Sequence, residues 1–237
     1  MRSTKNNLQV LHEDNHLIII NKKVGDIVQG DKTGDKPLSE IVKEYIKDKY
    51  KKPGKVFLGV VHRLDRPTTG VVIFAKTSKA LERMNKMLRE RKIQKTYWAL
   101  IEGSPSPTKG TLEHYLRKNP KNNKSTAFSK DTKDSKKAVL HYDSLLELDN
   151  YTLLEINLET GRHHQIRCQL SVCGHPIKGD LKYGSKRSNS NGGIHLHAVK
   201  IDFDHPVTKE SLSFIAPLPN DNLWQLCTSK LNHQTGF

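Results

Sequence analysis

One aspartate of this sequence stands between two arginines. Asp65 lies in the run His62-Arg63-Leu64-Asp65-Arg66-Pro67-Thr68-Thr69-Gly70, which follows an apolar stretch. Nearby positive charge keeps a carboxylate ionised, and an ionised carboxylate can act as a nucleophile or as a base. Taken alone, this arrangement favours a structural salt bridge over a catalytic group, because ion-pair networks place charged residues in the same way.

A second basic group opens a short helix that we expect near residue 165. The run Glu159-Thr160-Gly161-Arg162-His163-His164-Gln165-Ile166-Arg167 holds two arginines and two histidines. A guanidinium group binds phosphate or carboxylate in bidentate geometry. Arg162 and Arg167 are therefore candidate anion-binding residues.

Zinc is the competing interpretation of this second group, because Cys168, Cys173 and His175 follow His163 and His164 closely. A structural zinc site usually contains a Cys-x-x-Cys pair, which this sequence lacks. Cysteines five apart on a helix also point to different sides. We therefore predict no metal site, and burial of small thiols is sufficient to explain the cysteines.

Other catalytic signatures are missing from the sequence. It has no phosphate-cradling Gly-rich loop with lysine, no Gly-x-Gly-x-x-Gly dinucleotide loop and no Gly-x-Ser-x-Gly elbow. These patterns would have indicated nucleotide binding, dinucleotide binding or a serine hydrolase.

Positive charge dominates the 237 residues, with 40 Lys and Arg against 25 Asp and Glu and a formal net charge of +15. Such an excess favours a polyanionic partner, with nucleic acid as the leading candidate. Two segments, 76–95 and 117–137, carry most of it. The second is interleaved with Asn, Ser and Thr, which suits a mobile arm that contacts phosphates without reading sequence. A merely solvated loop is the alternative.

The elements that must position these groups follow from the hydrophobic pattern. Strands are predicted at 8–13 and 17–21, at 56–61 and 70–75, at 95–101 and 110–116, at 137–148 and 151–158, and at 194–203 and 211–215. Three helices are predicted. The first begins after Pro37 and is ended by Pro53-Gly54, and the second begins after a cap at Thr77 or Ser78. The third runs from Gln165 to Cys173, with Gly174 just past its end. Since strands outnumber helices without regular alternation, the class is α+β with a mixed or largely antiparallel sheet.

The cellular setting is predicted from what the sequence lacks. No apolar run is long enough to span a membrane or to form a signal-peptide core, and only three cysteines are present. We expect a cytoplasmic protein without a disulfide framework.

Several motifs in the same order resemble the RluA-type RNA pseudouridine synthases, over nearly the whole chain. The motifs are His62-Arg63-Leu64-Asp65 with Thr68-Thr69-Gly70, Lys95-Thr96-Tyr97-Trp98-Ala99-Leu100, Gly161-Arg162-His163-His164-Gln165-Ile166-Arg167, Gly174-His175-Pro176-Ile177-Lys178-Gly179-Asp180 with Tyr183-Gly184, Leu196-His197-Ala198, and His205-Pro206.

The resemblance implies a cofactor-free isomerase that converts uridine in RNA to pseudouridine. Asp65 would be the carboxylate that attacks the nucleoside, so that the base detaches, rotates and rejoins its ribose through carbon. Tyr97 would stack on the base or move a proton, Arg167 would pair with Asp65, and Leu196 would help to wall the base pocket.

The resemblance also implies RNA-contacting residues around this centre. Arg63 is similar to the arginine that enters the RNA stack where the target uridine has flipped out. The other expected substrate or RNA contacts are His62, Arg66, Thr69, Arg162, His164 and Gln165.

The implied fold is the pseudouridine synthase fold, a long, bent, mixed and largely antiparallel sheet with flanking helices and a central active-site cleft. Residues 1–237 would form a single catalytic domain without the small RNA-binding domain that precedes it in many relatives. We expect a monomer with no membrane association and no obligate protein partner. Two positions depart from the family pattern: His163 stands where Thr or Ser is commoner, and Lys22-Lys23 stands where Lys-Pro is usual.

Two rival functions stay open at this point. One is a non-catalytic RNA-binding protein of ribosome assembly that uses the same surface, and the other is a nucleoside hydrolase in which Asp65 activates water. The sequence also leaves open whether the RNA is ribosomal or transfer RNA, and whether one or several uridines are modified.

Overall fold

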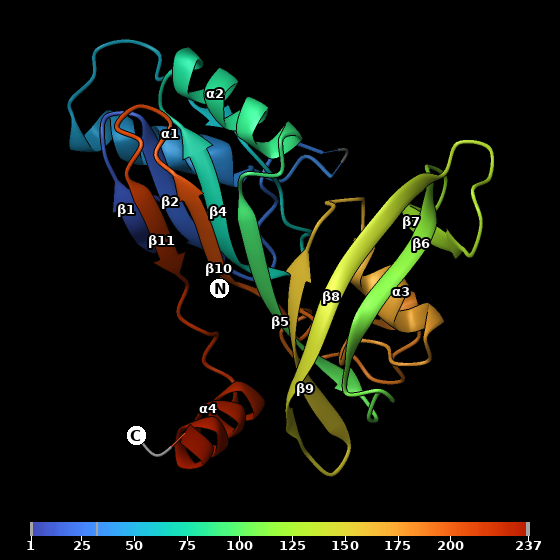
Figure 1. The fold of residues 1–237 in the computed structure, drawn as a ribbon. Helices are drawn as coiled ribbons and strands as arrows, with labels where there is room; N and C mark the ends of the chain where they lie inside the picture. The colour runs from blue at the N-terminus through green and yellow to red at the C-terminus, as the bar shows by residue number, and fades with distance from the viewer. Residues whose placement is uncertain (1, 32, 236–237) are drawn as a thin grey trace. The chain divides into compact units, whose positions relative to one another are not determined.

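The chain folds into two compact units in a computed structural model that describes residues 2–31 and 33–235 (Figure 1). The first unit comprises Met1–Ile93 and Ala198–Pro217, and the second comprises Gln94–His197 and Leu218–Phe237. Each unit is described by itself. The expectation that residues 1–237 form a single domain stays a prediction.

The first unit is built on a β-sheet in which β1, β2, β4, β10 and β11 follow one another and β3 pairs with β4. The strands are β1 (Val10–Glu13), β2 (Leu17–Lys22), β3 (Gly59–Val60), β4 (Thr69–Ala75), β10 (Leu196–Asp204, which starts in the second unit) and β11 (Ser211–Ile215). The helices are α1 (Leu38–Lys49) and α2 (Ser78–Arg89). The expected hairpin of 8–13 with 17–21 is confirmed as the antiparallel β1–β2 pair.

Burial of whole strands explains why the first sheet forms. Every residue of β2 and β4 is buried, so both faces of these β-branched runs are covered. Ala80 and Met84 of α2 pack on one face with Leu17 and Ile73. Thr77 caps α2 as expected, because its Oγ1 accepts a hydrogen bond of 3.1 Å from the backbone N–H of Ala80.

Two predicted boundaries in the first unit are wrong. The first helix ends at Lys49 rather than at Pro53-Gly54, because Lys51 turns into the left-handed region with φ 47°. The predicted strand 56–61 is reduced to Gly59–Val60, and Phe57 stays 48% exposed. A Cβ on Gly59 would lie 2.6 Å from a methyl carbon of Leu81, so glycine permits close packing of α2 at this point.

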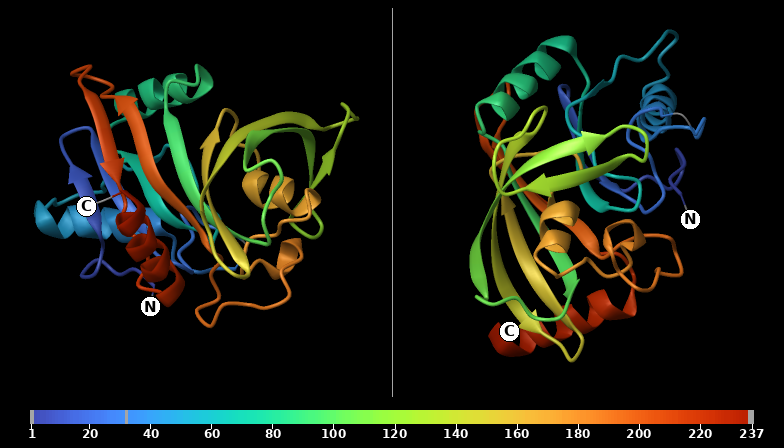
Figure 2. Two further views of the ribbon diagram at one scale, coloured as in Figure 1. Left: turned by 60° about the horizontal axis from the view of Figure 1, so that its bottom comes forward. Right: turned by 90° about the vertical axis from the view of Figure 1, so that its right-hand side faces the viewer.

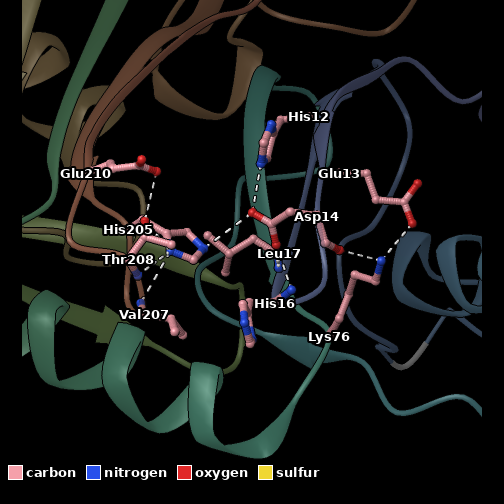
Figure 3. A network of polar contacts seen from close by, with 10 residues as sticks. All are labelled: His12, Glu13, Asp14, His16, Leu17, Lys76, His205, Val207, Thr208 and Glu210. Atoms are coloured by element: carbon pink, nitrogen blue, oxygen red, sulfur yellow. Dashed lines mark hydrogen bonds and ion pairs between the residues drawn. The ribbon is translucent and has the colours of Figure 1, made fainter.

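Asp14 ties the β1–β2 turn to the β10–β11 turn (Figure 3). Its Oδ1 accepts the backbone N–H of Leu17 at 2.7 Å, and its Oδ2 lies 2.8 Å from His12 Nε2 and 3.3 Å from His205 Nε2. The Nδ1 of His205 accepts the backbone N–H of Thr208 at 3.0 Å, which orients the ring beside Asp14. One carboxylate therefore connects two turns that are far apart in the sequence.

The second unit is an antiparallel sheet with the strand order β5-β9-β8-β6-β7. Its strands are β5 (Gln94–Glu102), β6 (Lys109–Asn119), β7 (Lys124–Phe128), β8 (Lys136–Glu147) and β9 (Tyr151–Leu158), and its helices are α3 (Gln165–Val172), the 3-10 turn η1 (Leu181–Tyr183) and α4 (Asn222–Thr235). The expected hairpin across Asp149-Asn150 joins β8 and β9. β6 and β8 curve around α3 (Figures 1 and 2).

Helix α3 lies where the sequence predicts it. It ends at Val172, one residue before the expected Cys173, and Gly174 follows with φ 88°, the left-handed conformation that glycine adopts easily. Cys168 of this helix is buried while Cys173 is exposed, so the two thiols do point to different sides.

The prediction of a mobile arm at 117–137 is wrong in part. Within it, β6 continues to Asn119 and pairs antiparallel with β7, in a hairpin that includes the pair Leu116 and Ala127. The guanidinium of Arg117 lies 4.8 Å from the centre of the Phe128 ring. The backbone N–H of Ser125 is fixed by the Tyr183 hydroxyl oxygen at 2.7 Å. The basic segment is therefore an ordered hairpin without RNA.

The C-terminal helix α4 was not predicted. Trp224 and Cys227 are buried in a cluster with Leu100, Leu146 and Leu153 of the second sheet. Their spacing of three places both side chains on one helix face.

The predicted α+β class with a largely antiparallel sheet is confirmed by these strands and helices. No helix within the described residues has the length and apolar character that crossing a membrane requires.

Candidate active site

A tight turn carries Asp65 in the first unit. The backbone carbonyl of Asp65 accepts the N–H of Thr68 at 3.0 Å, so Arg66 and Pro67 form the corner of the turn. Leu64 is buried and anchors the turn, while Asp65 itself is only partly buried. The backbone around the carboxylate is thus fixed and the carboxylate retains access to solvent.

Lys22, at the end of the buried strand β2, holds this turn from beneath. Its amino group donates to the backbone carbonyl oxygens of Lys23 at 3.0 Å, Arg66 at 3.2 Å and Thr68 at 2.7 Å. Three carbonyl oxygens match the three donors of an ammonium group. Burial lowers the pKa of Lys22 to about 7, although the charges of Asp26 and Asp65 act in the opposite direction. Lys22 is therefore both the anchor of the turn and a charged neighbour of Asp65.

The guanidinium of Arg66 is occupied by another segment. It donates to Asp35 Oδ2 at 2.5 Å and to Thr33 Oγ1 at 2.8 Å, and it lies 3.4 Å from Asp31. Hydrogen bonds from Arg2 and then from Arg66 lower the pKa of Asp35 to about 2. Of the two arginines that flank Asp65 in sequence, Arg66 thus serves a structural ion-pair network.

Arg63 differs from its neighbours in the same run. Its side chain is exposed and forms no hydrogen bond or ion pair with any residue in the described ranges. His62 is partly buried, and its Nε2 accepts the backbone N–H of Ile73 in β4 at 3.2 Å, so the ring fixes the path of the chain into the turn. Arg63 is therefore available to a partner, whereas His62 has a structural bond.

Gly70 follows the turn and allows the backbone to pass very close to β10. Its φ is 113°, and a Cβ there would lie 2.6 Å from the backbone nitrogen of Ala198. Thr69, which begins β4, is buried just before it. No other residue type fits at position 70 without moving β10.

Tyr97, Leu196 and Arg167 belong to the second unit, and all three are buried. Tyr97 lies on β5 opposite Ile156 of β9. Leu196 starts β10, and the preceding carbonyl of His195 accepts the N–H of Leu100 in β5. The sequence predicts that Asp65 of the first unit contacts these residues in a central cleft. That contact and the cleft stay predictions.

Arg167 forms a bidentate ion pair within the second unit. Its Nε donates to Asp180 Oδ2 at 2.6 Å and its Nη2 to Asp180 Oδ1 at 2.8 Å, and both side chains are at most 5% exposed. The guanidinium carbon also lies 5.0 Å from the centre of the Tyr183 ring. Asp180 and Tyr183 thus orient Arg167.

His164 and Gln165 are buried at the start of α3. His164 is in the left-handed region with φ 52°, and its Nδ1 lies 3.0 Å from the hydroxyl of Tyr183, which donates because its oxygen already accepts the N–H of Ser125. Burial raises the pKa of Tyr183 to about 12, so the hydroxyl keeps its proton. Gln165 Oε1 accepts from Thr160 Oγ1 at 2.8 Å. These bonds give both residues a structural role in shaping the helix start.

Arg162 and His163 lie at the surface of this segment. Arg162 is exposed, and its Nε donates to the carbonyl of Lys137 at 2.8 Å. The His163 ring stacks on His164 with centroids 3.7 Å apart, and its Nδ1 lies 2.9 Å from Ser125 Oγ. The histidine that departs from the family pattern therefore packs against the basic hairpin.

Sequence reasoning missed the partners that hold the predicted residues. Lys22 was noted only as part of a departure from the pattern, and Asp180 and Tyr183 were given no role. A lysine at the end of an apolar strand was the available signal for Lys22. Among the described residues, no group of three or more His, Cys, Asp or Glu side chains is arranged to hold a metal ion.

The sequence matches the family model described as RNA pseudouridylate synthase over residues 16–172. Relatives include "Uncharacterized RNA pseudouridine synthase slr1629" of Synechocystis sp., 37% identical over 90% of this chain and 66% of the relative. "Ribosomal large subunit pseudouridine synthase D" of Zymomonas mobilis is 31% identical over 90% of this chain and 70% of the relative. This chain thus spans about two thirds of the length of these relatives.

Solved structures of low sequence identity share the fold. "Human RNA Pseudouridylate Synthase Domain Containing 4" has a TM-score of 0.76 at 24% identity, covering 94% of this chain and 93% of the other. "Human RNA Pseudouridylate Synthase Domain Containing 1" has a TM-score of 0.72 at 22% identity, covering 96% and 90%. The family model, the relatives and this fold agree with the motifs around Asp65, Tyr97 and Arg167, and the chain belongs to the RluA-type RNA pseudouridine synthases, which are RNA-modifying isomerases.

Proposed function

We propose that this chain isomerises specific uridines of structured RNA to pseudouridine with Asp65 as the nucleophile. The observation that carries the proposal is the turn around Asp65. A buried ammonium group fixes its backbone through the carbonyls of Arg66 and Thr68, while the carboxylate stays partly exposed. A carboxylate held in this way can react without a large loss of conformational freedom.

The reaction consumes no external reagent. The carboxylate of Asp65 attacks the target nucleoside and the bond between N1 of uracil and C1′ of ribose breaks. The base rotates, and C5 bonds to C1′ as the bond between the Asp65 carboxylate and C1′ breaks, which restores the free carboxylate. The proton on C5 then leaves, and N1 carries a proton in the product. No metal or redox cofactor is needed for these bond changes.

Tyr97, Leu196 and Arg167 would complete the site. The buried Tyr97 and Leu196 supply the aromatic and aliphatic surface that suits a nucleobase. Tyr97 could also move the proton from C5. The guanidinium of Arg167, already oriented by Asp180, would pair with Asp65 and keep its carboxylate ionised.

Arg63 would replace the uridine in the RNA stack. A base inside a helix or a stacked loop must leave the stack before an enzyme can reach its ribose, which costs a few kcal/mol. The planar guanidinium can stack in the vacated space. The exposed Arg63, free of partners among the described residues, suits this task better than the ion-paired Arg66.

The substrate is expected to be ribosomal or transfer RNA. Ribosomal RNA has additional support because the Zymomonas relative is named a ribosomal large subunit pseudouridine synthase. We further propose that the protein acts in the cytoplasm as a monomer without an obligate protein partner. Mapping pseudouridines across total RNA with and without the gene would identify the position.

The substitution Asp65→Asn tests the nucleophile. We expect loss of pseudouridine formation with unchanged folding and RNA binding, since only one oxygen is replaced. The matched control is Asp48→Asn, which alters a surface carboxylate paired with Lys5. Normal turnover by Asp65→Asn would refute the assignment.

The same assay separates the rival functions. After incubation of uridine-labelled RNA with the protein, a synthase yields isomerised base, a non-catalytic RNA-binding protein yields no change, and a nucleoside hydrolase yields free uracil.

A further inference from the structure

Lys95 is a partly buried lysine that the proposed mechanism does not use. It lies near the start of β5, and removal of its amino group from water lowers its pKa. No residue in the described ranges forms a hydrogen bond or an ion pair with this amino group. A buried cation without a counter-ion is unfavourable, so the position needs a reason.

Gly161 provides space beside this amino group. A Cβ on Gly161 would lie 3.3 Å from Lys95 Nζ, and no other atom outside its chain neighbours would approach it so closely. The φ of Gly161 is not among the positive values of the chain, so the backbone does not require glycine here. Gly161 is also exposed. The missing side chain therefore leaves the ammonium group open to a ligand from solvent.

Lys95 and Tyr97 point to the same face of β5, because side chains two residues apart share a face of a strand. Their Cα atoms are therefore roughly 7 Å apart. The phosphates of an RNA strand are bonded to the same ribose that carries the base. A nucleoside on Tyr97 thus brings a backbone phosphate within reach of Lys95.

We propose that Lys95, beside the open face of Gly161, binds the phosphodiester next to the target uridine. A phosphate supplies the negative charge that the surrounding protein does not. Lys suits this contact because its ammonium acts as a point charge toward any oxygen of the phosphate. The proposal rests on the proposed function, since it assumes that Tyr97 contacts the target nucleoside.

The first test measures the binding of fluorescein-labelled pentauridylate at increasing salt concentration. Each phosphate contact on a single strand contributes about 0.7 to the slope of log K against log salt. We expect Lys95→Met to lose about that amount of slope, and Lys95→Arg to keep it. The control is Lys109→Met, which removes an exposed lysine whose charge is already paired with Asp143.

The second test uses the space at Gly161. Gly161→Leu should fill the space beside the Lys95 amino group and reproduce the loss of slope, whereas the single carbon added in Gly161→Ala would move that group by only a few tenths of an ångström. A pentauridylate whose phosphates are replaced by uncharged methylphosphonates should bind equally to the wild-type chain and to Lys95→Met. Gly161→Leu decides the outcome if Lys95→Met does not fold.

An unchanged slope in Lys95→Met would overturn the proposal. If Lys95→Met does not fold, an unchanged slope in Gly161→Leu would overturn it. A role of Lys95 in proton transfer alone would give this unchanged slope. Failure of the proposed function is a separate result, namely no pseudouridine formed by the wild-type protein. Asp65→Asn keeps the wild-type slope in either case.

Discussion

Lys22, which holds the Asp65 turn, and Arg167, a predicted site residue, are both buried cations, but they are neutralised differently. Lys22 in the first unit is surrounded by three backbone carbonyl oxygens. Arg167 in the second unit is matched by the two carboxylate oxygens of Asp180. A carbonyl carries only a partial charge, so three carbonyls cancel little of the positive potential that the protonated Lys22 amino group exerts at Asp65. The charge of Arg167 is shared with a full counter-ion.

The difference also concerns protons. A guanidinium cannot lose its proton in a protein, whereas a buried ammonium can. The pKa of Lys22 is lowered to about 7, mainly by burial. We therefore expect the turn around Asp65 to respond to pH and the Arg167 pair to be insensitive to it.

The largest expected effect is that of Asp180→Asn. Removing one partner of a buried ion pair deprives the other charge of that partner and costs about 3 to 5 kcal/mol. Urea unfolding measures this loss. The exposed pair of Lys109 and Asp143 is the matched control, and Asp143→Asn should cost no more than about 1 kcal/mol. Equal losses of unfolding free energy in Asp180→Asn and Asp143→Asn would show that the buried pair contributes no more stability than the exposed pair.

Lys22→Met should have the next largest effect. The carbonyls of Arg66 and Thr68 lose a charged donor, and hydrogen bonds to charged groups contribute about 1.5 to 3 kcal/mol each. We expect a loss of stability in that range and a larger loss of activity, because the turn carries Asp65. Lys23→Met is the control, since among the residues that the structure describes the Lys23 amino group donates to the carbonyl of Asn7 and not to the Asp65 turn. Full activity in Lys22→Met would contradict the role of the anchor.

A smaller effect is expected in how the unfolding free energies of wild type and Lys22→Met depend on pH. The pKa of Lys22 is about 7 in the folded chain and has the ordinary value of 10.5 when unfolded. Between these values the unfolded chain binds more protons, so wild-type stability rises with pH, by at most about 1.4 kcal/mol per pH unit. Unfolding free energies of wild type minus Lys22→Met from pH 7 to 9 measure it. A difference that falls with pH would be the opposite result.

Asp14→Asn should have a still smaller effect, because Asp14 bridges two turns without a charged lysine or arginine. Burial raises the pKa of Asp14, but hydrogen bonds from His12 and from backbone N–H groups outweigh it, so the pKa is lowered. Its stabilisation is therefore present above the unfolded pKa near 3.8 and is lost as the pH falls through the lower folded value. We expect a loss of about 1 kcal/mol at neutral pH, measured by thermal unfolding against Asp202→Asn. A change below that of the control would show that Asp14 does not hold the turns.

The smallest effect on stability is expected at the basic hairpin. Neutralising Lys118, Lys121 and Lys124 should leave unfolding unchanged. The slope of RNA binding against salt should fall by about 2, since each phosphate contact contributes about 0.7. Lys36, already paired with Glu44, is the control position. An unchanged slope would exclude the hairpin from the RNA interface.

The sequence predicted the elements whose apolar pattern is strong. Fully buried strands such as Thr69–Ala75 are continuous β-branched runs, and α2 has both a cap and a periodic stripe. β7 was missed because only Ala127 and Phe128 are apolar in it, and its order depends on Tyr183, which is far along the chain. The helix α4 was not predicted, although Leu223 and Leu226, like Trp224 and Cys227, are three residues apart as on one helix face.

The site was predictable only in part for a similar reason. Motif order predicts Asp65, Tyr97 and Arg167 as site residues, which stays a prediction, but it did not reveal the groups that hold them. The contact of Lys22 with the carbonyl of Thr68 joins residues 46 positions apart, and local pattern cannot reveal such a contact. The ion pair of Arg66 with Asp35 joins residues 31 positions apart, which explains why Arg66 looked like a neighbour for Asp65.

The anchoring of the turn through carbonyl oxygens has a consequence for the divergence of these enzymes. Every residue type at position 66 presents the same carbonyl to Lys22, so the identity of that side chain is not fixed by the anchor. The side chain at position 66 can therefore change without loss of this anchor, although Arg66 would then lose its ion pair with Asp35. In protein engineering, recognition could be altered at this turn with the chemistry kept, provided that Lys22 is retained.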